Sequence, residues 1–166
     1  MTTATPAAHW TYFIKKPFER SVSDEGMRSR QSSKPIGGET PSITVDQAYE
    51  ESIRALLKVF KEASRPGWDG YHATEVSSAT IGQALEFLDW IPSRLPKPEV
   101  SAHPDGQVGF EWWVGPRRVV TVSVNESGQV NYAALIEQDC FHGTMMLRDS
   151  FPETISAALS RIFLEA

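Results

Sequence analysis

The pattern that decides the fold runs from residue 99 to residue 124 and reads EVSAHPDGQVGFEWWVGPRRVVTVSV. Asp105-Gly106 is a strong signal for a two-residue hairpin turn, because both residue types tolerate the backbone angles of a tight reversal. Gly115-Pro116 marks a second turn, and the β-branched run after it favours a strand. We therefore predict antiparallel strands at residues 99–103, 107–114 and 118–124.

The pattern of short strands separated by turns continues to residue 147. A turn at Asn125–Gly128 separates the strand at 118–124 from a strand at 129–137. A last strand at 141–147 completes a meander of about five strands. Alternation along residues 107–114 divides the side chains between two faces of the sheet. The predicted helix-facing set is Val108, Phe110, Trp112 and Val114. Glu111 and Trp113 are predicted to lie on the open face.

Two helices are predicted before the sheet. The first has capping-box spacing at Thr44–Gln47, and its apolar residues recur at helical spacing: Tyr49, Ile53, Leu56, Leu57 and Phe60. The second begins near Ser77 and ends by Trp90–Pro92, and its stripe is Ile81, Ala84, Leu85 and Leu88. Gly82 lowers helix propensity, so we expect it to lie close to another backbone.

A third helix follows the sheet. Ser150–Glu153 has the spacing of a capping box with proline in the first turn. Its predicted buried stripe is Ile155, Ala158, Leu159, Ile162 and Phe163. Three helices packed on one face of an antiparallel meander define an α+β fold.

Composition is that of one globular domain. At 166 residues the chain can bury a core without disulfides or metals. No apolar run approaches the ~20 residues needed to span a bilayer, and residues 1–10 lack the pattern of a secretory signal. Cys140 has no second cysteine to pair with. We expect a cytoplasmic protein without a membrane partner.

The first 42 residues differ from the rest. They carry six basic and four acidic side chains, a net charge of +2, which leaves −7 for the remainder of a chain whose total is −5. A domain with this net negative charge is poorly suited to bind the phosphate backbone of a nucleic acid. We expect nucleic acid to bind only weakly, through the tail, and a protein partner to be basic.

Residues 1–42 are predicted to form a flexible tail, because Ser, Gly and Pro interrupt any periodic pattern from residue 21 to 42. Within the tail, residues 9–18 form an aromatic patch in which Trp10 and Tyr12 alternate with smaller residues. The patch either adds an edge strand to the domain, covering Trp113, or docks into a partner by strand addition. A single α+β domain then spans residues 43–166.

The most unusual local sequence is Arg65-Pro66-Gly67-Trp68-Asp69-Gly70-Tyr71-His72, between the first two helices. Its glycines permit positive φ, and Asp69 can accept a backbone N–H of its own turn. In one interpretation Trp68 and Tyr71 anchor the connection to the core. In the other, Asp69, His72 and Glu75 are acid/base or metal-binding groups on a rigid turn.

Other chemical motifs are weak. The four histidines are far apart in sequence, so no metal or cofactor is predicted. Cys140 and His142 share one face of a strand, but a lone cysteine is more often a small buried apolar residue than a nucleophile.

Several segments together resemble a group of small bacterial proteins without an established activity. The shared segments, in order, are Gly67–Tyr71, Leu95–Val100, Asp105-Gly106 and Glu111-Trp112. The resemblance spans residues 65–132 and implies a bacterial, single-domain module, without implying any catalytic residue. This chain departs from the group at His72, where glycine is expected after the tyrosine.

The leading functional hypothesis is a non-catalytic interaction module of a bacterial cytoplasmic complex, such as an antitoxin-like or immunity-like protein or an accessory subunit of a defence system. Its candidate binding residues are Trp10, Tyr12, Trp68, Asp69, Tyr71, Glu111 and Trp113. The alternative is a small hydrolase-like enzyme that uses Asp69 and His72, with Glu75.

Overall fold

The computed structural model describes residues 45–164. These residues all belong to one compact unit. Trp10, Tyr12 and the predicted cap at Thr44 lie outside them. The elements in chain order are α2 (Val45–Ala63), α3 (Ser78–Trp90), β1 (Glu99–Ala102), β2 (Val108–Gly115), β3 (Arg118–Val124), β4 (Gln129–Ile136), β5 (Asp139–Met146) and α4 (Glu153–Leu164).

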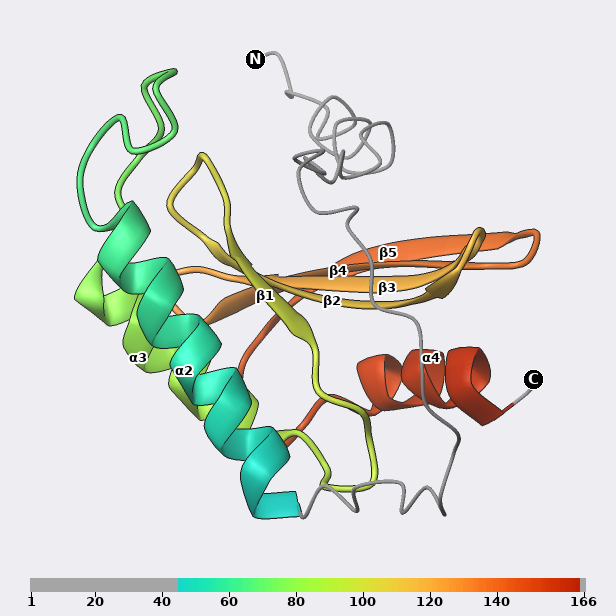
Figure 1. Cartoon of the computed structure of the whole chain (residues 1–166). Helices are drawn as coiled ribbons and strands as arrows, with labels where there is room; N and C mark the ends of the chain where they lie inside the picture. The colour runs from blue at the N-terminus through green and yellow to red at the C-terminus, as the bar shows by residue number, and fades with distance from the viewer. Residues whose placement is uncertain (1–44, 165–166) are drawn as a thin grey trace, which may run out of the picture. The chain divides into compact units, whose positions relative to one another are not determined.

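The predicted α+β fold is confirmed, with two helices before a five-stranded antiparallel sheet and one after it (Figure 1). Each strand pairs with its neighbour in sequence, in the order β1-β2-β3-β4-β5. The helices contact the sheet through β1 to β4 and leave its other face uncovered by described residues. None of the described helices combines the length and apolarity that crossing a bilayer requires.

The core lies between the helices and one face of the sheet. Phe87 of α3 is fully buried, and its ring centroid lies 4.8 Å from that of Phe110 and 5.5 Å from that of Phe151. Trp112 is also buried, and its indole N–H donates to the carbonyl of Pro96 at 2.7 Å. Phe87 was absent from the predicted stripe of α3, although helical spacing from Ala84 places it on the same side.

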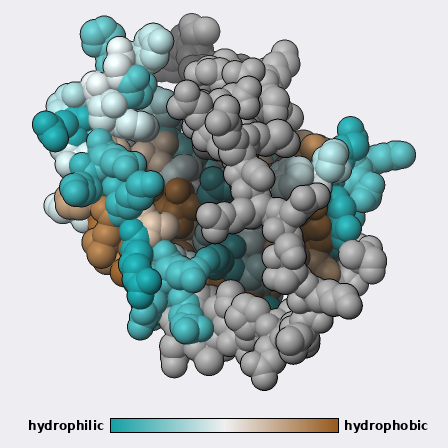
Figure 2. Space-filling model, in the orientation of Figure 1, coloured by the Kyte–Doolittle hydropathy of each residue, from teal (hydrophilic) through white to brown (hydrophobic). Residues whose placement is uncertain are grey.

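The predicted stripe of α2 is partly wrong. Leu56 is buried, but Tyr49 is 43% and Leu57 is 53% exposed. The helix packs against α3 and β1 only, so Ser52, Leu56 and Ala63 form the buried line and the neighbouring apolar residues remain at its margin. Figure 2 shows hydrophobic residues exposed beside hydrophilic ones on the helical side of the molecule.

Strand alternation holds along β2 until its end. Val108, Phe110 and Trp112 face the helices as predicted, but Val114 is exposed. The register between β2 and β3 shifts between Trp113 and Gly115, so this bulge removes Val114 from the helix-facing row.

The β1–β2 hairpin turn is longer than the two residues predicted. His103 N donates to Gln107 O and Gly106 N donates to His103 O, both at 2.9 Å, which encloses a three-residue loop ending at Gly106. Gly106 has a φ of 85°, the left-handed position of a hairpin that closes with a bulge. Asn125–Gln129 repeats this arrangement between β3 and β4.

The structure differs from two further predictions about the helices, the close packing of Gly82 and the start of the last helix. Ser77 caps α3 as predicted, accepting from the Thr80 amide at 3.1 Å. Gly82, however, is exposed and an added Cβ would meet nothing within 4 Å, so no close backbone explains it. The last helix, α4, begins at Glu153, later than the predicted box at Ser150. Of its predicted stripe, Ile155, Ala158, Leu159 and Ile162 are buried, and Phe163 is half-buried.

Two glycine substitutions test this packing in opposite directions. Gly82→Ala should stabilise the domain by about 0.5–1 kcal/mol, because alanine favours the helix and no atom obstructs its Cβ. Gly106→Ala should destabilise it by about 1–3 kcal/mol, since its φ is positive and the new Cβ would lie 2.9 Å from the Glu75 carbonyl oxygen. Chemical denaturation measures both changes, and equal signs would contradict the packing described.

Candidate functional site

The connection between α2 and α3 is a braced loop rather than a loose linker. Gly67 N donates to Ala73 O at 2.7 Å and Gly70 N donates to Gly67 O at 2.9 Å, so the chain closes on itself. Gly67 and Gly70 both have positive φ, 71° and 79°. We call residues 65–76 the aromatic loop. Its backbone is fixed by hydrogen bonds within the loop and to the sheet.

Asp69 organises the tip of the aromatic loop. Its Oδ1 accepts from the amide of Tyr71 at 2.7 Å and from the amide of Ala73 at 3.0 Å. These two hydrogen bonds, that of Tyr71 first, lower the pKa of the Asp69 carboxyl because they favour its charged form. This is the turn-capping role that the residue type predicts.

Trp68 joins the loop to the rest of the domain. Its ring packs against the core, and its indole N–H donates to the carbonyl of Thr74 at 3.0 Å. Thr74 N in turn donates to Pro104 O in the β1–β2 turn at 2.7 Å. The aromatic loop therefore rests on the hairpin through a backbone contact that Gly106 leaves room for.

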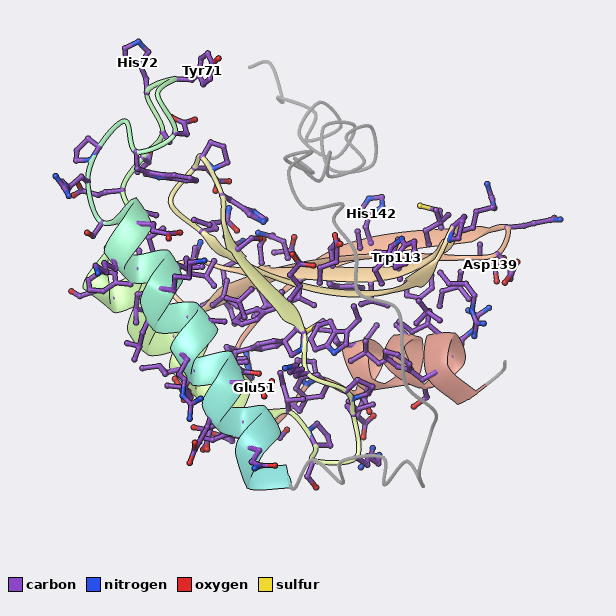
Figure 3. All side chains as sticks on the ribbon, viewed as in Figure 1. Glu51, Tyr71, His72, Trp113, Asp139 and His142 are labelled. Atoms are coloured by element: carbon purple, nitrogen blue, oxygen red, sulfur yellow. The ribbon has the colours of Figure 1, made fainter. Side chains whose placement is uncertain are left out.

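Tyr71 does not anchor the loop, contrary to the prediction. Its side chain is 86% exposed, because the turn at Asp69 directs it away from the core. His72 follows with a φ of 72°, in the left-handed region that favours glycine. Figure 3 shows Tyr71 and His72 side by side at the far tip of the loop. Two aromatic side chains are thus held outward on a fixed backbone.

The open face of the sheet carries the second group of predicted residues. Trp113 is 65% exposed, and Glu111 lies two positions before it on the same face. Glu111 is directly opposite Glu99 of β1. Partial loss of hydration, and secondarily the charge of Glu99, raise the pKa of Glu111. The pair is therefore a place where a positive charge would be stabilised.

A ladder of polar side chains crosses the same face and was not predicted. Gln107 Oε1 accepts from Ser123 Oγ at 2.7 Å and from Asn131 Nδ2 at 3.1 Å. Asn131 Oδ1 accepts from Thr144 Oγ1 at 2.9 Å. The alternation of the strands predicts that these residues share a face, but the hydrogen bonds depend on the inter-strand register.

The catalytic alternative gains no support from this arrangement. Asp69 is engaged by two backbone amides, and His72 and Glu75 are exposed. Two grooves lie instead beside α2. Both are bordered by Ser52, Lys97 and Pro98, and neither includes a residue of the aromatic loop. Lys97 forms an ion pair there with Glu51 (Figure 3).

The structure also shows where the remaining candidate residues, Cys140 and His142, lie. Cys140 is exposed, not buried as its residue type suggests, since it lies on the open face of the edge strand β5. His142 is on the same face (Figure 3). Among residues 45–164, no group of three or more His, Cys, Asp or Glu side chains is placed to hold a metal ion.

Comparisons with known protein families, curated proteins and solved structures find no match to this chain.

Replacing Asp69 tests its structural role. Asp69→Ala should lower Tm and speed amide hydrogen exchange at Tyr71 and Ala73 on the order of tenfold, because both amides lose their acceptor. Asp69→Asn keeps Oδ1 and should retain most protection. Because folding lowers this pKa, the charge contributes stability above the ordinary Asp pKa of about 3.9 and loses it as pH falls through the folded value. Unchanged exchange in the alanine variant would disprove the role.

Glu111 should show the opposite dependence. Its pKa is raised in the folded state, so the charged form is disfavoured above the ordinary Glu pKa of about 4.3. Glu111→Gln should therefore raise Tm near about pH 7, and the gain should disappear by about pH 3.5, where the carboxyl is protonated in both states. Thermal unfolding at both pH values measures this. Thr121→Ser, an uncharged change opposite Glu111 on β3, is the control for altered packing.

Proposed function

We propose that this chain is a non-catalytic protein-interaction module of a bacterial cytoplasmic complex, and that the aromatic loop is its primary contact. The observation that carries the proposal is Tyr71, which is 86% exposed although two hydrogen bonds to Asp69 fix the backbone on either side of it. A tyrosine held this way presents a large amphipathic surface to a partner.

Pre-organisation is the physical reason for preferring the loop. A side chain on a mobile turn loses conformational entropy when it binds, whereas a braced turn has already lost it during folding. The backbone of His72 supports this view, because a non-glycine residue in the left-handed conformation raises the free energy of the folded state by about 1–2 kcal/mol. The loop keeps that strain while directing two polar aromatic side chains outward.

Charge supports a basic partner. The part of the chain after residue 42 carries a net charge of −7. On the open face, Glu111 and Glu99 are opposed, and Trp113 is exposed on the same strand as Glu111. An Arg or Lys of a partner would relieve the repulsion between the carboxylates and contact the indole ring. An acidic surface with exposed aromatic side chains is compatible with an antitoxin-like, immunity-like or defence-accessory role.

The proposal is tested by in vivo crosslinking. A photoreactive phenylalanine analogue at position 71 should crosslink the full chain to one protein in its bacterial host, identified by mass spectrometry. The matched control is position 49, because Tyr49 is an exposed tyrosine on α2, away from the loop. Crosslinking of the same proteins from both positions would indicate nonspecific contact and contradict the proposal.

Affinity provides the quantitative prediction. With the captured partner purified, Tyr71→Ala should weaken binding by at least about 30-fold, the effect of removing a hot-spot residue worth about 2 kcal/mol. Tm should not change, because the side chain contacts solvent. Tyr49→Ala should alter binding less than about twofold. Titration calorimetry measures each Kd, and equal effects of the two substitutions would refute the loop as the contact.

A further inference from the structure

A groove lies between α2 and the edge strand β1. It has a volume of about 270 Å³ and is bordered by one side of α2 and by residues 97–100. The apolar residues of its helical wall are Ala55 and Val59, and both are half-buried. The charged residues at its border are Glu51, Lys58, Glu62, Lys97 and Glu99.

The position of α2 explains why a groove forms here. Among the strands, α3 contacts β2 and β3, whereas α2 contacts β1 alone. Figure 1 shows α2 beside β1 at this edge of the sheet. Packed helices are about 8–10 Å apart and paired strands about 4.8 Å apart, so a helix next to α3 covers two strand positions. One of these positions is β1, and the other lies beyond the edge of the sheet.

The backbone of β1 can pair with a strand at that position. His103 N donates to Gln107 O, so the odd-numbered residues of β1 exchange hydrogen bonds with β2. Val100 and Ala102 therefore direct their N–H and C=O groups away from β2. No hydrogen bond to these outward groups is found among residues 45–164.

We propose that an extended peptide segment of a partner protein adds to β1 as an antiparallel sixth strand and fills the groove. Its residues opposite Val100 and Ala102 exchange backbone hydrogen bonds with β1 and direct apolar side chains toward Ala55 and Val59. Its residue opposite Glu99 is Lys or Arg. From N- to C-terminus, the recognised sequence is an apolar residue, any residue, an apolar residue and then a basic residue.

Charge complementarity favours the basic residue. The two lysines at the groove are paired with glutamates of α2, Lys97 with Glu51 and Lys58 with Glu62 at 4.0 Å. Glu99, in contrast, lies opposite another carboxylate, that of Glu111 on β2. A cation on the added strand would lie next to Glu99 on the open face, where an acidic side chain would be repelled.

The short length of β1 makes the side-chain contacts necessary. β1 has four residues, and Pro98 before it has no N–H to donate. A strand of this length provides few backbone hydrogen bonds, so the groove and Glu99 must contribute to affinity and specificity. This surface shares with the proposed function a preference for a basic partner, but it does not include the aromatic loop. Crosslinking from position 71 does not report on β1, so either proposal can fail alone.

Peptide selection tests the sequence preference. The probe is a library of random octapeptides displayed on phage, selected against the immobilised full chain. Selected peptides should share the alternating pattern and a Lys or Arg after the second apolar residue. Against Glu99→Lys, the same library should give Asp or Glu at that position. Peptides without the pattern, or the same basic peptides from both chains, would overturn the proposal.

Hydrogen exchange with a selected peptide tests the strand pairing. The amides of Val100 and Ala102 should exchange on the order of tenfold more slowly when the peptide is bound, because each gains a hydrogen bond. The amide of Ser101 should not change, because β2 already accepts it. Equal slowing of all three amides would contradict strand addition.

Two tryptophan substitutions on α2 test the groove. Ala55→Trp should fill it and weaken peptide binding by at least about tenfold, whereas Leu57→Trp, at a 53% exposed position outside the groove, should change Kd less than about twofold. Titration calorimetry measures both, and equal effects would place the peptide elsewhere and refute the proposal. Light scattering without peptide tests the other occupant. A dimer that the peptide dissociates would show that a second copy holds this edge, and would also refute it.

Discussion

Contact between Phe87 and the aromatic rings on either side of it determines which face of the sheet is buried. Phe110 projects from β2 and Phe151 from the segment before α4, so one ring of α3 connects the first and last parts of the domain. Burial of a phenylalanine contributes roughly 1.5–3 kcal/mol. With this face committed to the core, the side chains of opposite parity lie on the open face. Trp113 and Glu111 are exposed there, and the polar ladder around Gln107 is partly buried by its own hydrogen-bonded side chains.

The aromatic loop depends on the same division of the sheet. Because α2 and α3 lie on the buried side, their connection must pass beside the β1–β2 turn, where Thr74 meets Pro104. Trp68 packs inward from this contact and Asp69 turns the chain outward beyond it. Within four residues the loop thus holds one aromatic side chain inward and another outward: Trp68 packs against the core, and Tyr71 is exposed.

Local pattern was sufficient to predict the elements, because strand alternation, glycine turns and helical spacing act over a few residues. Alternation also placed Glu111 and Trp113 on the open face. The local pattern gave wrong predictions where contacts between distant parts of the chain determine whether a side chain is buried. The exposure of Leu57 depends on how far α2 is rotated against β1, and that of Val114 depends on a bulge opposite β3. The sequence left open whether Tyr71 anchors the loop to the core or is a binding residue, because its size is visible in the sequence, whereas the direction set by Asp69 is not.

The meander topology also bears on the order of folding. Every strand pairs with its sequence neighbour, so the sheet can grow hairpin by hairpin with little loop-closure entropy at each step. The contact of Thr74 with Pro104 joins segments thirty residues apart and requires both the β1–β2 turn and the end of α2. It can therefore form only after both segments are in place. Loss of this contact would free the aromatic loop from the hairpin, so the outward direction of Tyr71 depends on two segments that meet only in the folded domain.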